Sequence, residues 1–187
     1  LLGSAWPVMH EAFQVPLSYA GMVTMIISGG TICSSLMSER LTKKFGTQIV
    51  TVFSVMLTAI ALFGFSTASA FWMLCLWAIP YGLGAGAIDA ALNNYVALHY
   101  NSRHMSWLHC FWGLGTIISP YVMSYALTTS VWQNGYRIVS FIQIGITLIL
   151  FVTLPVWKVN KKEMAQEEKA EEEMVGIKGA LKIKGVP

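Results

Sequence analysis

The sequence predicts an all-α integral membrane protein, and two observations lead to this fold class. Apolar residues make up 55% of the 187-residue chain and charged residues only 11%, whereas soluble domains carry about 25% charged residues. Several apolar stretches also reach the roughly 20 residues that a helix needs to cross a bilayer. Because lipid cannot hydrogen-bond to the backbone, spans this apolar must be helical.

The first three expected elements lie before residue 67. Residues 1–9 are apolar but too short to cross a membrane, so we expect them to be the end of a helix whose start is missing. Full spans follow at 18–38 and 48–66, with charged residues between them. One face of the first full span carries a stripe of hydroxyl side chains, which could line a pore or hydrogen-bond to another helix. The stripe consists of Thr24, Ser28, Thr31, Ser35 and Ser38.

The next expected span, 71–98, contains a single charged side chain, Asp89. A carboxylate inside a membrane is costly and usually faces a cavity, a partner or a proton path. Four residues of this span, Asp89 among them, recur at helical spacing and share one face: Gly82, Gly86, Asp89 and Asn93. We expect the two glycines to allow close helix packing and Asp89 to take part in proton coupling. The alternative for Asp89 is a buried, hydrogen-bonded structural acid.

The expected span 105–128 also has one small and polar face. Its members are Ser106, His109, Gly113, Thr116 and Pro120. His109 could relay a proton, contact a substrate or be a hydrogen-bonded core histidine. Its depth in the membrane differs from that of Asp89 by about 7 Å, at a rise of about 1.5 Å per residue. A direct pair between them therefore needs a water or a tilt.

The last expected span, 136–157, precedes a charged, Glu-rich stretch at 158–187. We expect that stretch to be an exposed linker. Eleven of the twelve Lys and Arg residues fall in 39–46, 99–104 and 158–187, and Arg137 is the exception. Because positively charged loops stay in the cytoplasm, these three segments are expected to be cytoplasmic in a multi-pass protein of the cell membrane.

Several other kinds of site find no support in the sequence. The glycine-rich run 82–86 lies inside a membrane span with no preceding strand, so it is not a dinucleotide-binding loop. Three histidines spaced by five residues, beginning at His99, share no helix face, so no metal site is expected. We expect no cofactor, no nucleic-acid partner and no enzymatic activity. A membrane-embedded enzyme would need a second catalytic group at the depth of Asp89.

Three stretches resemble a known family. Residues 82–96, in which a glycine-rich run precedes Asp89 and then Asn93, resemble the fourth-helix signature of fucose-permease-like sugar:proton symporters in the major facilitator superfamily. Residues 108–120 resemble the fifth-helix signature of that branch, and residues 35–46 resemble the superfamily's charged loop between helices two and three. Residues 1–157 would then be the six-helix N-terminal half, with a truncated first helix, of a twelve-helix major facilitator fold.

The resemblance implies alternating access, in which two halves rock around a site at the membrane midplane. It implies proton coupling at Asp89, for which His109 is a second candidate. It also implies a cytoplasmic charge network that gates opening, formed here by Glu39, Arg40, Lys43 and Lys44. In the fifth-helix signature it implies helix packing at Gly113, Gly115 and Pro120.

The substrate is expected to be a small solute such as a sugar, because the candidate contacts combine aromatic faces with amide groups. These candidates are Asn93, Asn94, Tyr95, Trp112 and Gln143. Tyr95 points away from Asp89 on an ideal helix and is included for its residue type alone. The expected partners are the solute, protons, the lipid bilayer and a missing C-terminal half.

Sugar:proton symport is therefore the expected function. A drug or organic-acid antiporter of the same superfamily is one alternative, and a non-transporting membrane sensor or scaffold is another.

Overall fold

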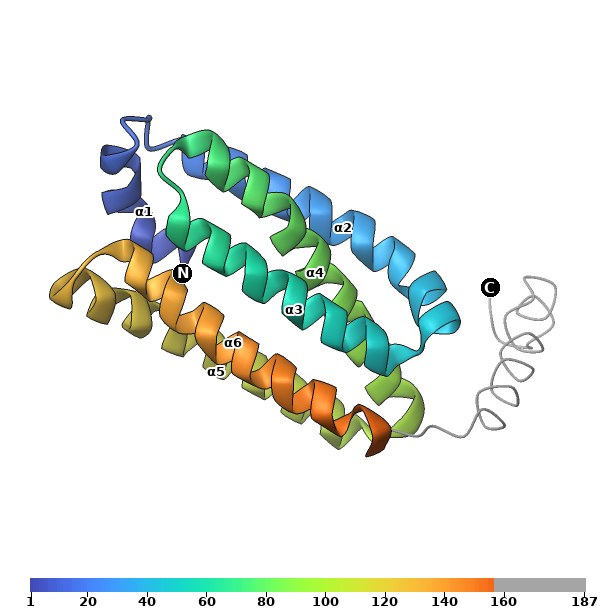
Figure 1. Ribbon diagram of the computed structural model, residues 1–187. Helices are drawn as coiled ribbons and strands as arrows, with labels where there is room; N and C mark the ends of the chain where they lie inside the picture. The colour runs from blue at the N-terminus through green and yellow to red at the C-terminus, as the bar shows by residue number, and fades with distance from the viewer. Residues whose placement is uncertain (157–187) are drawn as a thin grey trace, which may run out of the picture. The chain divides into compact units, whose positions relative to one another are not determined.

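The structure, a computed structural model, describes residues 1–156 (Figure 1). Within these residues the helices are α1 (Leu2–Ala12), α2 (Tyr19–Phe45), α3 (Thr47–Thr67), α4 (Phe71–His99), α5 (Ser102–Thr129) and α6 (Trp132–Thr153). Leu1–Val152 forms one compact unit. The second unit begins at Thr153 and contains a short 3-10 helix, η1 (Leu154–Val156). The expected linker 158–187 and Trp157 lie outside the described residues.

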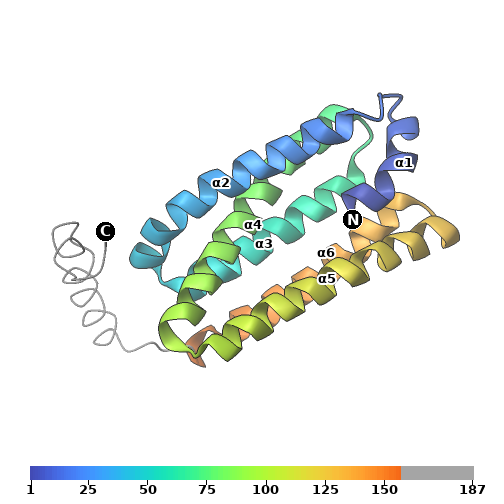
Figure 2. The same ribbon diagram turned by 180° about the vertical axis from the view of Figure 1, so that it is seen from behind.

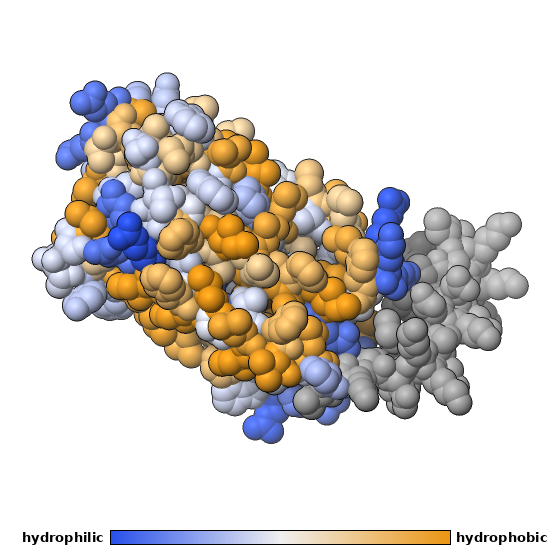
Figure 3. All heavy atoms as spheres, viewed as in Figure 1, coloured by the Kyte–Doolittle hydropathy of each residue, from blue (hydrophilic) through white to orange (hydrophobic). Residues whose placement is uncertain are grey.

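The expected all-α membrane fold is confirmed for this part of the chain. Five of its helices, α2 to α6, are long and apolar enough to cross a membrane. Large apolar side chains also stand exposed, with 75% of Met25 and 77% of Leu36 accessible. On the face shown in Figure 3, hydrophobic residues cover most of the surface between the two ends of the helices. A soluble protein rarely exposes so much apolar surface.

Helix α2 continues through the charged segment that the sequence analysis places in a loop. The expectation of a loop at 39–46 is wrong, because the chain is helical as far as Phe45 and only Gly46 separates α2 from α3. Gly46 has a φ of +86°, which favours glycine. Lys43 and Lys44 occupy the last turn, where the helix dipole favours cations. Hydropathy marks the part of a helix in lipid and misses such a charged extension.

The helices of the first unit pack in two groups. Helix α4 lies against both α2 and α3. Helices α5 and α6 overlap along their length in the two opposite views (Figures 1 and 2), and they meet where Gly135 of α6 rests against Met123 and Ala126 of α5. Side chains of α6 also reach α3, since the Ser140 hydroxyl donates a hydrogen bond of 2.9 Å to the Ala59 carbonyl.

The contact between α2 and α4 is close enough to exclude side chains from two positions. A Cβ atom at Gly82 would overlap the Ile27 carbonyl oxygen, and one at Gly86 would overlap the Thr31 carbonyl oxygen. Small residues allow helices to approach in this way inside a membrane.

Three hydroxyls of the polar stripe on α2 bond across this contact to the backbone of α4. Thr31 Oγ1 donates to the Gly82 carbonyl at 3.3 Å, and Ser35 Oγ donates to the Gly86 carbonyl at 3.2 Å. Ser38 Oγ donates to the Ala87 carbonyl at 3.2 Å. Of the two uses that the sequence leaves open for the stripe, these three residues therefore serve helix association, although Thr31 also borders a cavity described below.

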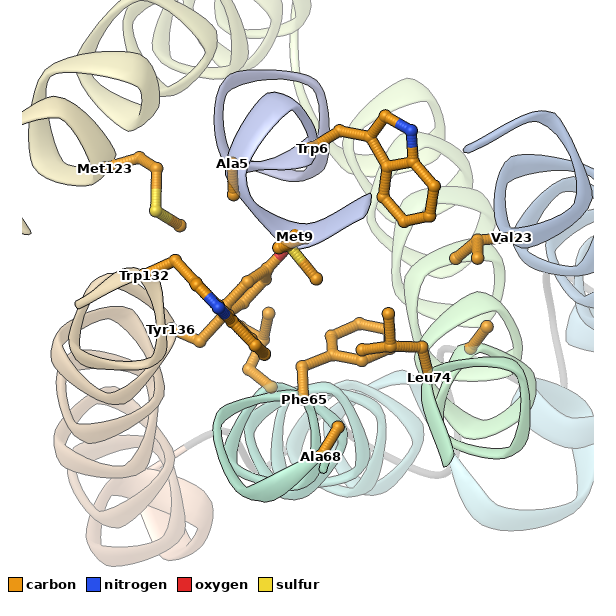
Figure 4. Packing of buried hydrophobic residues seen from close by; sticks show 12 residues of the cluster. Ala5, Trp6, Met9, Val23, Phe65, Ala68, Leu74, Met123, Trp132 and Tyr136 are labelled. Carbon is orange, nitrogen blue, oxygen red and sulfur yellow. The ribbon is translucent and has the colours of Figure 1, made fainter. Parts of the chain in front are cut away.

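The buried apolar core gathers at the end of the bundle that α1 occupies (Figure 4). Trp6 and Met9 of α1 point into it, and the Tyr136 hydroxyl donates to the Met9 sulfur at 3.7 Å. The ring of Tyr136 lies 5.5 Å from that of Phe65, centroid to centroid. The Trp6 indole N–H donates a 2.7 Å hydrogen bond to the Leu17 carbonyl, which ties α1 to the start of α2. This packing holds α1 in place beside the cavities described next.

Candidate functional site

A cavity of about 670 Å³ lies between helices α2 to α6. Its lining combines apolar side chains with one acid, one histidine, two amides and three hydroxyl groups. The lining residues are Thr31, Val55, Thr58, Tyr81, Ala85, Ile88, Asp89, Leu92, Asn93, Leu108, His109, Phe111, Trp112 and Gln143. Five residues that the sequence analysis singles out for proton or solute contact are among them: Asp89, His109, Asn93, Trp112 and Gln143.

Asp89 stands in this cavity as an accessible carboxylate. Among the described residues, its side chain has neither an ion-pair nor a hydrogen-bond partner. Asn93 follows one turn later on the same helix, and His109 reaches the cavity from α5. The structural alternative for Asp89, a buried and hydrogen-bonded acid, is therefore not what the described residues form.

Two amide side chains bring unpaired acceptors to the cavity. Asn93 Oδ1 and Gln143 Oε1 are both buried, and no donor among the described residues reaches either oxygen. A buried polar atom without a partner costs about 1–3 kcal/mol. A hydrogen-bond donor that entered the cavity, from water or from a solute, would recover that cost.

A second cavity, of about 420 Å³, adjoins the first. The two share the lining residues Tyr81, Trp112 and Gln143. The second cavity extends toward α1, and its lining is mainly apolar and aromatic, with four hydroxyl groups, two of them on tyrosines, and the shared amide. Its other lining residues are Leu1, Leu2, Ile27, Leu62, Phe65, Gly115, Thr116, Ser119 and Tyr136.

Two of the predicted solute contacts lie outside both cavities. Asn94 is exposed and lines neither of them. Tyr95 stacks on His99 instead, with ring centroids 4.3 Å apart. The physical reason is the turn of about 100° per residue in a helix, which carries both side chains away from the face of Asp89 and Asn93. A solute contact at Asn94 or Tyr95 stays a prediction, and neither residue lines these cavities.

The helix packing predicted at Gly113 and Gly115 finds no partner within the described residues and stays a prediction. A Cβ atom at either glycine would meet nothing within 4 Å, and Gly115 borders the second cavity. Pro120 lies inside α5 and is exposed. Helix α5 meets α6 farther along, where Gly135 rests against Met123 and Ala126.

The predicted gating residues lie at one end of α2, and none of them lines either cavity. Lys43 Nζ and Glu39 Oε1 form an ion pair of 3.0 Å within the helix. The Lys44 ammonium lies 5.2 Å from the centroid of the Phe45 ring. Arg40 is exposed. These exposed contacts contribute little to stability.

Sequence reasoning missed several cavity residues, above all Tyr81. Tyr81 lies between Pro80 and Gly82 in an apolar run and has no polar neighbour on its face, so no pattern marked it. Thr58, Thr116 and Ser119 were missed as solute contacts because single hydroxyls in membrane helices usually bond to their own backbone. No group of three metal-binding side chains occurs in residues 1–156.

The fold and the site together define a multi-pass membrane protein whose helices enclose a polar cavity with an acid in it. The chain belongs to the Major Facilitator Superfamily, whose family profile matches residues 1–186. Members of this superfamily are transporters and not enzymes.

Two curated relatives are similar to most of this chain. Bypass of stop codon protein 6 from Saccharomyces cerevisiae is 24% identical over 153 residues, which cover 80% of this chain and 31% of that protein. The glucose/mannose transporter GlcP from Bacillus subtilis is 23% identical over 169 residues, which cover 88% of this chain and 40% of that protein. The chain thus spans well under half the length of either relative. No solved structure matches it significantly.

Proposed function

We propose that this chain is part of a proton-coupled symporter for a small neutral solute, most plausibly a sugar. One observation carries the proposal: Asp89 presents a carboxylate without a counter-charge to a cavity between membrane-spanning helices. Intramembrane acids of this kind usually serve ion or proton movement.

The lack of a counter-charge suggests how coupling works. An ionised carboxylate is costly to enclose away from water, so a charged Asp89 opposes closure of the cavity. A proton on Asp89 removes that cost. Closure around a loaded site then requires the proton, and opening to the other side releases it. Alternating access by two halves around a midplane site is the motion that fits this scheme.

The lining of the cavity supports a solute that offers both hydroxyl groups and an apolar face. Asn93 and Gln143 supply unpaired amide oxygens, and Trp112 supplies a flat aromatic surface. Neither cavity is lined by Lys or Arg among the described residues, which disfavours an anionic solute such as an organic acid. The Bacillus relative is named as a glucose/mannose transporter, which agrees with this chemistry.

The proposal includes the place of this chain in a larger protein. Residues 1–157 would form the six-helix N-terminal half, and 158–187 would form a cytoplasmic linker to a second half that completes the cavity. The length of the two relatives is consistent with this arrangement. The ends of the helices near Lys43 and Arg103 would face the cytoplasm, and the protein would reside in the cell membrane.

The test is solute uptake by the protein expressed from its own gene, with a panel of radiolabelled sugars and with or without an imposed pH gradient. We expect the gradient to stimulate uptake in the wild type and not in Asp89→Asn. Glu11→Gln is the matched control, because Glu11 is an exposed carboxylate outside both cavities, and it should retain the stimulation.

Full gradient-driven uptake in Asp89→Asn would contradict the role of Asp89. A wild type that takes up no sugar, yet confers resistance to toxic compounds, would favour the drug antiporter. Absence of any flux would favour a membrane sensor or scaffold.

A further inference from the structure

The two cavities meet at three side chains from three different helices. Tyr81 comes from α4, Trp112 from α5 and Gln143 from α6, and each lines both cavities. We call these three residues the neck. Asp89, Asn93 and His109 lie on one side of the neck, in the larger cavity only. Thr116 and Ser119 lie on the other side, in the smaller cavity only.

The neck combines a flat aromatic surface with polar groups that lack partners. Trp112 is 69% exposed, so its ring is open to a ligand. Gln143 Oε1 is buried and has no donor among the described residues. The Tyr81 hydroxyl has no hydrogen bond within the described part of the chain, while the Tyr81 ring packs 5.9 Å from that of Phe65, centroid to centroid.

Neighbouring side chains contact two of the neck residues. Phe65 holds the Tyr81 ring from one side, and Phe65 itself is only 4% exposed. The Gln143 carbonyl accepts a 2.7 Å hydrogen bond from Thr147 Oγ1, so the unpaired group at this position is the side-chain amide alone. A buried acceptor, the hydroxyl of a packed tyrosine ring and an open indole ring together offer a ligand one acceptor, one hydroxyl and one flat apolar face.

Resting on the proposed function, we propose that the neck is the solute-selecting site and that it is separate from the proton site at Asp89. It would hold one ring of a neutral polyhydroxylated solute, with the apolar ring face against Trp112. A solute hydroxyl would donate to Gln143 Oε1, and another would bond to the Tyr81 hydroxyl, since hydroxyls both donate and accept. The two cavities, of about 670 and 420 Å³, fall within the usual range for small-molecule sites, about 300–1,000 Å³.

If solute recognition and proton coupling depend on different residues, variants of the two sites should show different defects. Variants of the neck should weaken solute recognition and leave the response to a proton gradient in place. Asp89→Asn should do the reverse. A site in which the solute bonded mainly to Asp89 would not separate the two effects.

The experiment uses the protein expressed from its own gene, purified and reconstituted in liposomes, with radiolabelled glucose and mannose. Counterflow, the exchange of labelled for unlabelled sugar without any gradient, gives the half-saturation concentration. Gradient-driven uptake gives the stimulation by protons. Gln143→Leu and Tyr81→Phe are the test variants, because both keep the bulk of the side chain.

We expect Gln143→Leu to raise the half-saturation concentration in counterflow about tenfold, which is the effect of losing one hydrogen bond in a buried site. Tyr81→Phe should raise it less, because water can replace a lost hydroxyl contact at a partly accessible group. In both variants the ratio of uptake with and without a pH gradient should stay at the wild-type value.

Two control variants match these substitutions. Gln133→Leu removes another buried, unpaired Oε1 on α6 that lines neither cavity. Tyr121→Phe removes the hydroxyl of a tyrosine on α5 that is 73% exposed and lines neither cavity. Both should keep the wild-type half-saturation concentration, and size-exclusion chromatography should show every variant folded.

The outcomes separate the two proposals. Sugar exchange in the wild type with the same half-saturation concentration in Gln143→Leu and Gln133→Leu would overturn the neck and leave symport standing. Loss of proton stimulation in Gln143→Leu would also overturn the separation of the two sites. A wild type that exchanges neither sugar would overturn the sugar assignment itself, and the neck as a sugar site with it.

Discussion

At the scale of single residues, the polar groups of the site differ in what surrounds them. The Asp89 carboxylate is accessible and unpaired in the larger cavity, whereas the Asn93 and Gln143 oxygens are buried and unpaired. The Ser140 hydroxyl of α6, by contrast, donates to a backbone carbonyl of α3. Asp89, Asn93 and Gln143 all line the larger cavity, where the solute is proposed to bind, while the buried and unpaired Thr51 Oγ1 and Gln133 Oε1 lie outside both cavities.

Glycines give a first prediction at this scale. Gly82→Ala places a methyl group against the Ile27 carbonyl, and such overpacking costs about 1–3 kcal/mol. Gly113→Ala meets nothing within 4 Å and should gain about 0.5–1 kcal/mol from the higher helix propensity of alanine. We expect the thermal unfolding temperature in detergent to fall for Gly82→Ala and to hold or rise for Gly113→Ala. Equal temperatures in the two variants would contradict the close contact between α2 and α4.

The residues that sequence reasoning found and missed follow a physical pattern. Asp89, His109 and Gln143 stand out because polar side chains are rare in membrane spans, and each of them lines the larger cavity. Tyr81 was missed because tyrosine is common in apolar helices and its position in the cavity depends on how α3, α4 and α6 pack. That packing depends on small-residue contacts far apart in the sequence, which no local pattern contains.

At the scale of helices, the contact between α2 and α4 is hydrogen-bonded as well as close. Thr31, Ser35 and Ser38 each donate to a carbonyl of α4, and such bonds between membrane helices contribute about 0.6 kcal/mol each. Helices in lipid gain little from burying apolar surface against one another. These hydrogen bonds therefore contribute a larger fraction of the free energy of helix association than they would in water.

The triple variant Thr31→Val, Ser35→Ala and Ser38→Ala tests this contribution. We expect it to lower the free energy of unfolding by about 2 kcal/mol, the sum of three interhelical bonds, as measured by reversible unfolding in mixed micelles. Ser28→Ala is the control, because Ser28 belongs to the same stripe and is exposed. A triple variant as stable as this control would show that the hydroxyls add nothing to the association.

Helix number could be predicted from the sequence, and so could the ends of α3 and α4 to within one residue, but the charged end of α2 could not. The apolar runs predict five spans, and α2 to α6 are the five long apolar helices of the described chain. Helix α4 has 29 residues, which is about 43 Å at about 1.5 Å per residue and exceeds the roughly 30 Å of a bilayer core. Hydropathy marks the part of a helix that lies in lipid. It therefore misses the charged last turn of α2, which extends past that part.

At the scale of the whole molecule, the proposed orientation can be tested with single cysteines in a background without native ones. Ser69 lies between α3 and α4 and Ser102 begins α5, so the length of α4 separates them, and both are exposed. In intact cells, a membrane-impermeant maleimide should label Ser69→Cys and leave Ser102→Cys unlabelled, because Arg103 and the nearby basic residues favour the cytoplasm. Both should react after permeabilisation. The opposite pattern in intact cells would reverse the orientation.

The single-residue connection at Gly46 bears on how the chain enters the membrane during synthesis. Only one residue separates α2 from α3, so we expect the two helices to enter the membrane together as a hairpin. The turn of that hairpin carries Lys43 and Lys44, charges that resist translocation. Helix α3 is the most apolar of the long helices, and its burial in lipid would favour insertion of the pair. We therefore expect the orientation of both helices to be set at this one connection.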